Sequence, residues 1–347
     1  MIKYMSADIL SRADELCSAF DYSEAEKICR EYLEEYPEDA AVWTKLGAVL
    51  RNTEDLTGAC GAFERAFEIE PENPGYAENL GDALALLHSF EEAQALFEKA
   101  AEADERPEND RLYPKLRRAD MLFFRGKTAD AADALEKLAK ECPNAPDVYR
   151  RLYVVYEADG KAEGKAAAAD ALEKEIALRK TRAEETNGAA EYLFLGAAYL
   201  EKKAYKEAEA AAGTSLSAED SPDAYLLLGT ACAKEGKLSE AKEAFSKGTA
   251  CEPKNLAFLL ETADTLTELG LYDEAVSVYT KALELRNVRA DTWASLAYAL
   301  LMLGKKEEAK AFFEMAKASA AVRELKWADK LHKSDKTRAL DEAFGRQ

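Results

Sequence analysis

Residues 43–50 read WTKLGAVL, and the pattern continues through Ala59, Phe63, Ala66 and Pro71. A large residue is followed by Leu46 and then by a small residue, Gly47. A small residue lets a paired helix approach closely, and a large neighbour fills the space beside it. The proline after the second apolar run marks where a helix stops. The stretch therefore predicts two antiparallel helices joined by a short turn.

The same pattern recurs along nearly the whole chain. A shift of 34 residues from Trp43 gives Ala77, Leu80, Gly81, Leu84, Ala93, Phe97 and Ala100. Repeat frames begin near residues 6, 40, 74, 112, 146, 189, 222, 256 and 290. A single helix pair cannot bury its apolar face, so stacked pairs must share a continuous core. We therefore expect an all-α array of about nine helix pairs.

This pattern closely resembles the tetratricopeptide repeat family over residues 6–323. The resemblance implies a right-handed superhelical solenoid of helix-turn-helix repeats with a C-terminal capping helix. It also implies a concave groove, formed by the first helix of each repeat, that binds peptides or helices from other proteins.

The spacing of the frames divides the chain into four expected parts. Residues 1–110 hold three acidic repeats, 111–188 two repeats with a lengthened helix, 189–323 four repeats, and 324–347 a capping helix and polar tail. The polar segment 101–111 is expected to be a loop or hinge. The extended helix is marked by apolar residues Ala169, Leu172, Ile176 and Leu178, and the capping helix by Leu325, Trp327, Ala328 and Leu331. The tail 333–338 is expected to fray.

Composition and charge limit the functions that are open to the chain. Its 347 residues are 48% hydrophobic, with a formal net charge of −20. Residues 1–110 carry 9 basic and 27 acidic side chains, which repel nucleic acid and anionic lipid. This acidity serves either solubility or a basic partner. No run approaches the roughly 20 apolar residues of a membrane span, and the first residues lack an apolar signal core. We therefore expect a cytoplasmic protein with no nucleic acid partner and no membrane insertion.

The residue types that carry chemistry do not form a recognisable site in the sequence. Six cysteines contain no C-x-x-C pair and are expected to be reduced, structural thiols. The two histidines, His88 and His332, fall in different units, and the spacing of neither zinc ligands nor a phosphate-binding loop occurs. We expect no cofactor, no metal and no catalytic residues, and therefore no enzyme.

Some family members grip the carboxylate tail of a chaperone with Lys, Asn and Arg side chains on three successive first helices. Here Asn79 and Arg117 fall at matching positions. Thr44, Ala48 and Tyr113 stand where the other polar residues should be. The resemblance therefore does not extend to chaperone-tail capture.

A cluster of arginines suggests a different ligand. Arg117, Arg150 and Arg151 fall on the expected first helices of adjacent repeats, with Lys115 and Arg118 nearby. Because arginine forms bidentate bonds to carboxylates and phosphates, these residues predict a pocket for an acidic or phosphorylated segment. The alternative is that they pair locally with Asp120 and Asp147.

The last four repeats carry apolar residues at the expected groove positions, namely Leu193, Ala197, Leu226, Leu260 and Tyr298. They predict a groove for an apolar or amphipathic segment. The alternative is that some of them face the core, because Phe194 and Leu227 compete for the same stripe. The residues leave open whether the groove binds an extended peptide or a helix, and whether the array self-associates.

These patterns favour a non-catalytic adaptor or assembly scaffold that binds a partner segment in its groove. Two alternatives stay open: an obligate structural or regulatory subunit of a larger enzyme or secretion complex, and a chaperone-like holder of apolar segments. Co-purification in a fixed ratio favours the obligate subunit, and promiscuous binding of unfolded segments favours the holder.

Overall fold

The structure is a computed structural model of the chain, and it describes all residues except 1, 54, 103–107, 286–289, 323–334 and 345–347. The described part of the chain is helical and contains no strand. It divides into two compact units, unit 1 (Met1–Leu178) and unit 2 (Arg179–Gln347). None of the described helices is both long and apolar enough to cross a membrane.

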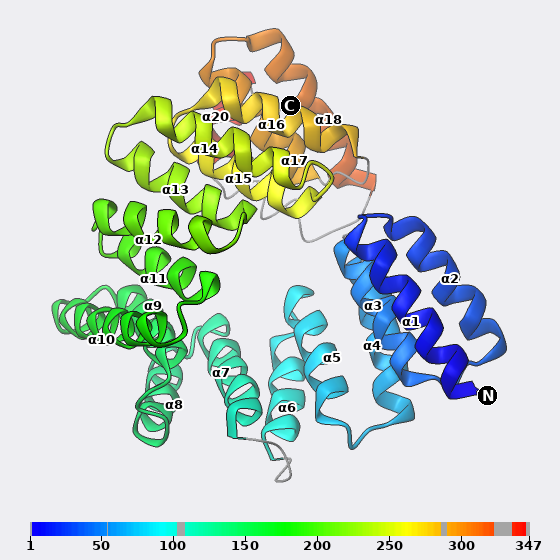
Figure 1. Cartoon of the computed structure of the whole chain (residues 1–347). Coiled ribbons are helices and arrows are strands. Elements are labelled where there is room, and N and C mark those ends of the chain that lie inside the picture. The colour runs from blue at the N-terminus through cyan, green and yellow to red at the C-terminus, as the bar shows by residue number, and fades with distance from the viewer. Residues whose placement is uncertain (1, 54, 103–107, 286–289, 323–334, 345–347) are drawn as a thin grey trace. The chain divides into compact units, whose positions relative to one another are not determined.

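Unit 1 is built from consecutive helix pairs, and the two helices of each pair lie side by side (Figure 1). The predicted frame starts at 40, 74 and 146 are the first residues of α3, α5 and α9. The helices are α1 (Ile2–Ser18), α2 (Tyr22–Glu35), α3 (Ala40–Asn52), α4 (Leu56–Ile69), α5 (Pro74–Leu86), α6 (Phe90–Ala101), α7 (Glu108–Phe124), α8 (Thr128–Glu141), α9 (Pro146–Asp159) and α10 (Ala162–Thr186).

Unit 2 begins within α10 and continues the same alternation of first and second helices. The predicted starts at 189, 222, 256 and 290 coincide with the starts of α11, α13, α15 and α17. The helices are α11 (Ala189–Glu201), α12 (Tyr205–Ala218), α13 (Pro222–Lys234), α14 (Leu238–Cys251), α15 (Leu256–Glu268), α16 (Tyr272–Glu284), α17 (Ala290–Met302), α18 (Lys306–Val322) and α20 (Asp335–Phe344). The predicted all-α repeat array is confirmed.

Small residues on the first helices make room for aromatic rings from the second helices. A Cβ added to Gly47 would lie 2.7 Å from the Phe63 ring, and one added to Gly229 would lie 2.8 Å from Phe245. Both rings are almost fully buried. Since interiors are packed as densely as organic crystals, the glycine and the ring specify each other.

In the turns whose residues the structure describes, a left-handed residue recurs at one fixed place inside the pair. Gly236 has φ +83°, and its N–H donates to the carbonyl of Ala233 at 3.0 Å, which closes the end of α13. Among these described turns, the left-handed residue carries a side chain at Phe20, His88 and Lys203. Their positive φ costs conformational energy that glycine avoids.

The two irregular segments differ in detail from the expectation. Residues 108–111, predicted to be loop, belong to the first turns of α7. The 25-residue helix α10 takes up the extra residues of the fifth repeat. Of its expected apolar residues, Leu172 and Ile176 are buried and Leu178 is half-buried, whereas Ala169 is exposed.

The C-terminal part also departs from the expected frayed tail. The residues expected to mark a capping helix, Leu325 to Leu331, lie outside the described residues. Instead, α20 spans residues that were expected to belong to the polar tail, and it packs against α17. A buried leucine, Leu340, is the reason that this polar-looking segment holds a defined position.

Candidate functional site

Every residue predicted to bind a partner lies on the first helix of a pair. Asn79 is on α5, Arg117 on α7, and Arg150 and Arg151 are on α9. Leu193, Leu226, Leu260 and Tyr298 are on α11, α13, α15 and α17. We call the side of these first helices that carries such residues the first-helix face, and describe it for each unit by itself.

In unit 1, Arg117 and Arg151 form a chain of ion pairs with aspartates of their own or of the preceding first helix, which we call the Asp–Arg ladder (Asp82, Arg117, Asp120 and Arg151). Arg117 Nε lies 2.8 Å from Asp82 Oδ1, and Arg117 Nη1 lies 3.1 Å from Asp120 Oδ2. Arg151 Nε donates to Asp120 Oδ1 at 3.0 Å. The four side chains are only 18–25% exposed.

The ladder follows the repeat register. Asp82 and Asp120 are the ninth residues of their frames, and Arg117 and Arg151 are the sixth residues of the frames that follow. Burial disfavours the charge on Arg117, but Asp82 and Asp120 outweigh it and raise the pKa of the guanidinium. Asp82 also accepts a hydrogen bond from the Tyr113 hydroxyl at 2.5 Å. The ladder therefore balances its own charges between successive first helices.

The remaining polar residues of the prediction are placed differently. Arg150 lies over the Tyr153 ring, with 5.6 Å from its guanidinium carbon to the ring centroid. Asn79 on α5 is half-buried. Lys115 and Arg118, expected near Arg117, line a separate pocket. The structure thus joins Arg117 to Arg151 through Asp120, and it does not bring Lys115 or Arg118 to the ladder.

In unit 2 the first-helix face is apolar. Leu226 and Leu260 are half-buried at the edge of a core cluster, whereas the adjacent Leu227 is only 6% exposed. Leu227 packs over Gly196 of the preceding first helix, where an added Cβ would meet its Cδ2 at 2.5 Å. Of the two neighbours in this stripe, Leu227 is therefore buried, whereas Leu226 is half-buried at the edge of the core.

The two other apolar positions of unit 2 are also half-buried. Leu193 lies beside Phe194, which is 48% exposed and has the Arg179 guanidinium carbon 4.8 Å from its ring centroid. The ring of Tyr298 meets that of Tyr272 edge-on, at a centroid distance of 6.4 Å. Partly exposed apolar side chains thus recur on four successive first helices, α11, α13, α15 and α17.

Acidic side chains accompany the apolar ones in unit 2. Asp223 on α13 and Glu261 on α15 are exposed residues, yet partial loss of solvent around their carboxyl groups raises the pKa of both. The charge of Glu252 adds to the rise at Asp223, and the charge of Asp223 adds to the rise at Glu261. Carboxylates held near other carboxylates favour a positively charged neighbour.

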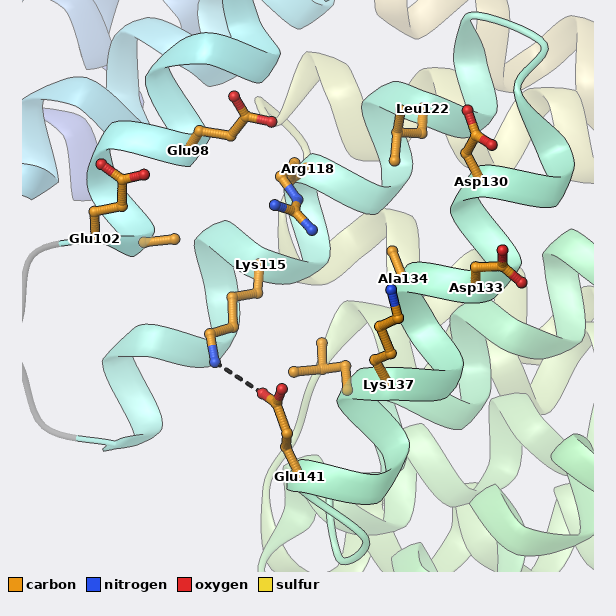
Figure 2. A pocket seen from close by; sticks show the side chains of 12 residues that line it. Glu98, Glu102, Lys115, Arg118, Leu122, Asp130, Asp133, Ala134, Lys137 and Glu141 are labelled. Atoms are coloured by element: carbon orange, nitrogen blue, oxygen red, sulfur yellow. Dashed lines mark hydrogen bonds and ion pairs between the residues drawn. The ribbon is translucent and has the colours of Figure 1, made fainter.

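A pocket of about 550 Å³ lies between α6, α7 and α8 of unit 1 (Figure 2). Lys115 and Arg118 of α7 point toward it, and Lys115 Nζ forms an ion pair with Glu141 Oε2 of α8 at 3.0 Å. Carboxylates from α6 and α8, among them Glu98 and Asp133, surround these cations. The mixture of both signs of charge around an open pocket selects no particular ligand.

Sequence reasoning named Asp120 as an alternative partner of the arginines, but it missed three features of these surfaces: Asp82 of the ladder, the pocket, and the contact made by α20. The repeat register could have indicated the ladder. In two pairs of adjacent frames, an acidic residue at the ninth position is followed by a basic residue at the sixth position of the next frame. Lys45 and Asp14 stand at the same two positions and form an ion pair with 2.5 Å between Nζ and Oδ1. The pocket had no sequence signal, since its lining comes from three helices.

Several solved structures share parts of this arrangement, and all of these likenesses have TM-scores below 0.5. The crystal structure of MamA protein is 15% identical and covers 52% of this chain and 94% of its own, with a TM-score of 0.43. The crystal structure of TTC0263, a thermophilic TPR protein of Thermus thermophilus, is 23% identical and covers 56% and 100%, with a TM-score of 0.43. A human IFIT1 dimer with m7Gppp-AAAA is 16% identical and covers 86% and 68%, with a TM-score of 0.49.

A curated relative is similar over much of the chain. The TPR repeat-containing protein MJ1428 of Methanocaldococcus jannaschii is 25% identical over 243 residues, which are 70% of this chain and 42% of that protein. The similar region spans less than half of that relative's length.

Family models of the tetratricopeptide repeat match four segments of the chain. They cover residues 10–77, 115–145, 222–255 and 266–327, which fall in both units. These segments contain the helix pairs whose starts, turns and glycine–aromatic contacts repeat in register. The chain belongs to the tetratricopeptide repeat family.

Proposed function

We propose that the chain is a non-catalytic, cytoplasmic adaptor or assembly scaffold, and that the first-helix face of unit 2 holds the partner segment. The fold supports a protein-interaction role in general. The observation that carries the finer proposal is the recurrence of half-buried apolar residues, Leu193, Leu226, Leu260 and Tyr298, on four successive first helices. These side chains lie only partly buried at the edges of the core, whereas their neighbours Leu195, Leu227, Leu259 and Leu296 are almost fully buried.

The chemistry of this face favours an amphipathic segment with basic residues among apolar ones. Apolar side chains of the segment would cover Leu226 and Leu260, whose remaining exposed area is then removed from water. Lysine or arginine of the segment would lie near Asp223 and Glu261, whose pKa values are raised mainly by loss of solvent and further by a neighbouring carboxylate. A helix suits a face built from parallel helical ridges, and helix-in-groove binding uses anchors at such spacing.

Affinity purification of the tagged chain with mass spectrometry tests this proposal, with a parallel Leu226→Asp variant. We expect the partner to be lost, because a carboxylate would replace an apolar anchor. Leu238→Asp is the matched control: Leu238 is 49% exposed on the second helix α14, so its variant should retain the partner. Equal recovery with both variants would contradict the proposal.

The same experiment separates the three roles that the sequence leaves open. A partner recovered in fixed ratio and lost only with Leu226→Asp supports a dedicated adaptor, or an obligate subunit if the chain is unstable without it. Many unrelated segments, all weakened by Leu226→Asp, support a chaperone-like holder.

The arginines of unit 1 carry a second proposed contact, for an acidic or phosphorylated segment near Arg117, Arg150 and Arg151, with Asn79 as a neighbouring polar group. A phosphate would have to replace Asp120 as the acceptor for Arg117 and Arg151, since both are engaged with it. The double variant Arg150→Gln/Arg151→Gln should then lower the affinity for a phosphopeptide, and Asp120→Asn should raise it. The loss in the double variant should be at least as large as the gain in Asp120→Asn. If the double variant binds the phosphopeptide as well as the wild type does, the ladder is purely structural.

A further inference from the structure

The C-terminal helix α20 lies against first helices of unit 2. It packs on α17, and its residue Lys336 reaches α15. It therefore contacts the face that we propose for partner binding, in the region of Tyr298.

The centre of this contact is a fully buried leucine. Leu340 is 0% exposed and belongs to one cluster with Ala294, Ala297, Phe313 and Ala316. Phe344 lies at the edge of the same cluster, with its ring centroid 6.4 Å from that of Phe313. The small residues of α17 leave the space into which Leu340 fits.

The start of α20 supplies a cation to an aspartate of the array. Lys336 Nζ lies 2.8 Å from Asp264 Oδ1 and 3.5 Å from Ser295 Oγ. Asp264 also accepts a hydrogen bond from the Tyr279 hydroxyl at 2.7 Å. The contact thus joins one charged anchor to an apolar one.

Comparison with the ladder of unit 1 explains why Asp264 needs this cation. Asp264 is the ninth residue of its frame, as Asp82 and Asp120 are of theirs. In unit 1 the sixth residue of the next frame is arginine and pairs with that aspartate, but in unit 2 the corresponding residue is Ser295. Serine cannot supply a charge, so the array leaves a carboxylate for a cation from another segment.

The three anchors of α20 share one face. Lys336, Leu340 and Phe344 are spaced four residues apart, which places them in line on a helix. Only ten residues form α20, and so short a helix is marginal in isolation. Its order depends on these anchors, and a second helix with the same anchors could replace it.

We propose that α20 is an internal occupant of a helix-binding site formed by α15, α17 and α18. The site's external ligand is an amphipathic helix with a basic residue followed by apolar residues four and eight positions later. This inference rests on the proposed function in taking the first-helix face of unit 2 as a binding surface, and it adds the position and side-chain pattern of the ligand. Because α20 is tethered, its high effective concentration lowers the apparent affinity of a free helix.

The test uses a fluorescently labelled peptide with the sequence of residues 335–344, DKTRALDEAF, and the full-length chain. Fluorescence anisotropy compares the wild type with Lys336→Glu and with a Leu340→Asp/Phe344→Asp double variant. We expect each variant to bind the peptide at least tenfold more tightly than the wild type, because the tethered competitor has been removed. Because Lys336→Glu keeps every apolar residue, its peptide affinity can be measured even if the double variant folds poorly.

Two controls show that binding uses the site. A peptide with aspartate in place of the leucine equivalent to Leu340 should not bind any of the chains. Ala343→Asp changes an exposed residue of α20 and should leave peptide binding at the wild-type level. Equal binding by wild type and variants, or no binding to any chain, would overturn the proposal and leave α20 as a permanent cap.

Light scattering tests whether the site is occupied by α20 from a second copy of the chain. A wild-type chain that forms dimers, which Leu340→Asp/Phe344→Asp dissociates, would show that α20 is exchanged between copies, and this would contradict internal occupancy. The outcomes are independent of the test of the proposed function. Loss of the partner with Leu226→Asp supports the proposed function whether or not the peptide binds. Binding of the peptide supports the site at α17 whether or not Leu226→Asp affects the partner.

Discussion

The first-helix faces of the two units carry different chemistry on the same repeat scaffold. In unit 1 the sixth and ninth residues of adjacent frames are arginine and aspartate, which neutralise each other in the Asp–Arg ladder. In unit 2 the neighbouring positions leave apolar side chains half-buried and carboxylates without such arginines, and at α17 a helix from the chain itself covers the face. The charges of the unit 1 face are paired with one another, whereas part of the unit 2 face is covered by α20.

This difference separates two sets of residues within one repeat. The buried positions are alike in both units, since Gly47 with Phe63 in unit 1 corresponds to Gly229 with Phe245 in unit 2. The surface positions are free to vary, because stability in a repeat array is the sum of repeat and interface terms that the buried residues supply. Family membership therefore follows from the first set, and binding chemistry from the second.

The largest expected effect distinguishes core from surface within unit 2. Leu227→Asp should destabilise the unit by about 4 kcal/mol, because it buries a charge and leaves a cavity over Gly196. Leu226→Asp should cost only about 1 kcal/mol, since Leu226 is already half-exposed. Hydrogen exchange of α13 amides measures both values locally. Equal losses would show that Leu226 is a core residue, and the apolar face would then not be a separate surface.

The next effect tests whether the ladder holds unit 1 together. Asp120→Asn should lower local stability by about 1–2 kcal/mol, because two partly buried arginines lose a charged acceptor. The loss should shrink only slightly in about 1 M salt, because partly buried ion pairs are screened less than exposed ones. Amide exchange in α7 and α9 reports the effect. Asp264→Asn is the matched change in unit 2, and it should instead loosen α20, where Lys336 is the only charged partner that the described ion pairs give Asp264.

The shared turn provides a control in which the two units should behave alike. Gly126→Ala in unit 1 and Gly236→Ala in unit 2 should each cost about 1 kcal/mol, because both glycines have positive φ and open space around the added Cβ. Lys203→Gly should gain up to about 1 kcal/mol for the opposite reason. Chemical denaturation followed by circular dichroism measures all three. Unequal losses from the two alanine variants would mean that the units differ in their scaffold as well as on their surface.

The smallest expected effect is a pH dependence confined to unit 2. Since the pKa values of Asp223 and Glu261 are raised, the folded chain binds protons more readily than the unfolded chain does. Unit 2 should therefore gain stability as the pH falls below neutrality toward the ordinary carboxyl pKa near about 4. A basic helix bound near these carboxylates should bind less tightly over the same range.

Urea denaturation and peptide titration at two pH values measure these opposite trends. Asp223→Asn with Glu261→Gln should remove both of them. A pH dependence that survives in this double variant would assign it to other carboxyl groups.

The sequence by itself determined the helix pairs, their order and most of their first residues. It could do so because the spacing of small, large and turn residues is a local property, repeated often enough to fix the register. The starts of α3, α5, α9, α11, α13, α15 and α17 were all predicted from these spacings. The same local argument failed for residues 108–111 and for α20, where a polar composition hid helices.

Only the tertiary structure decided how the candidate residues are used. Arg117 finds Asp82 at a separation of 35 residues, and Lys336 finds Asp264 at a separation of 72. Leu226 and Leu227 are identical in sequence terms, yet only the packing of α11 against α13 buries Leu227. Local spacing specifies which face a residue belongs to, but the exposure and the charge partner of a side chain depend on helices that are brought together only by folding.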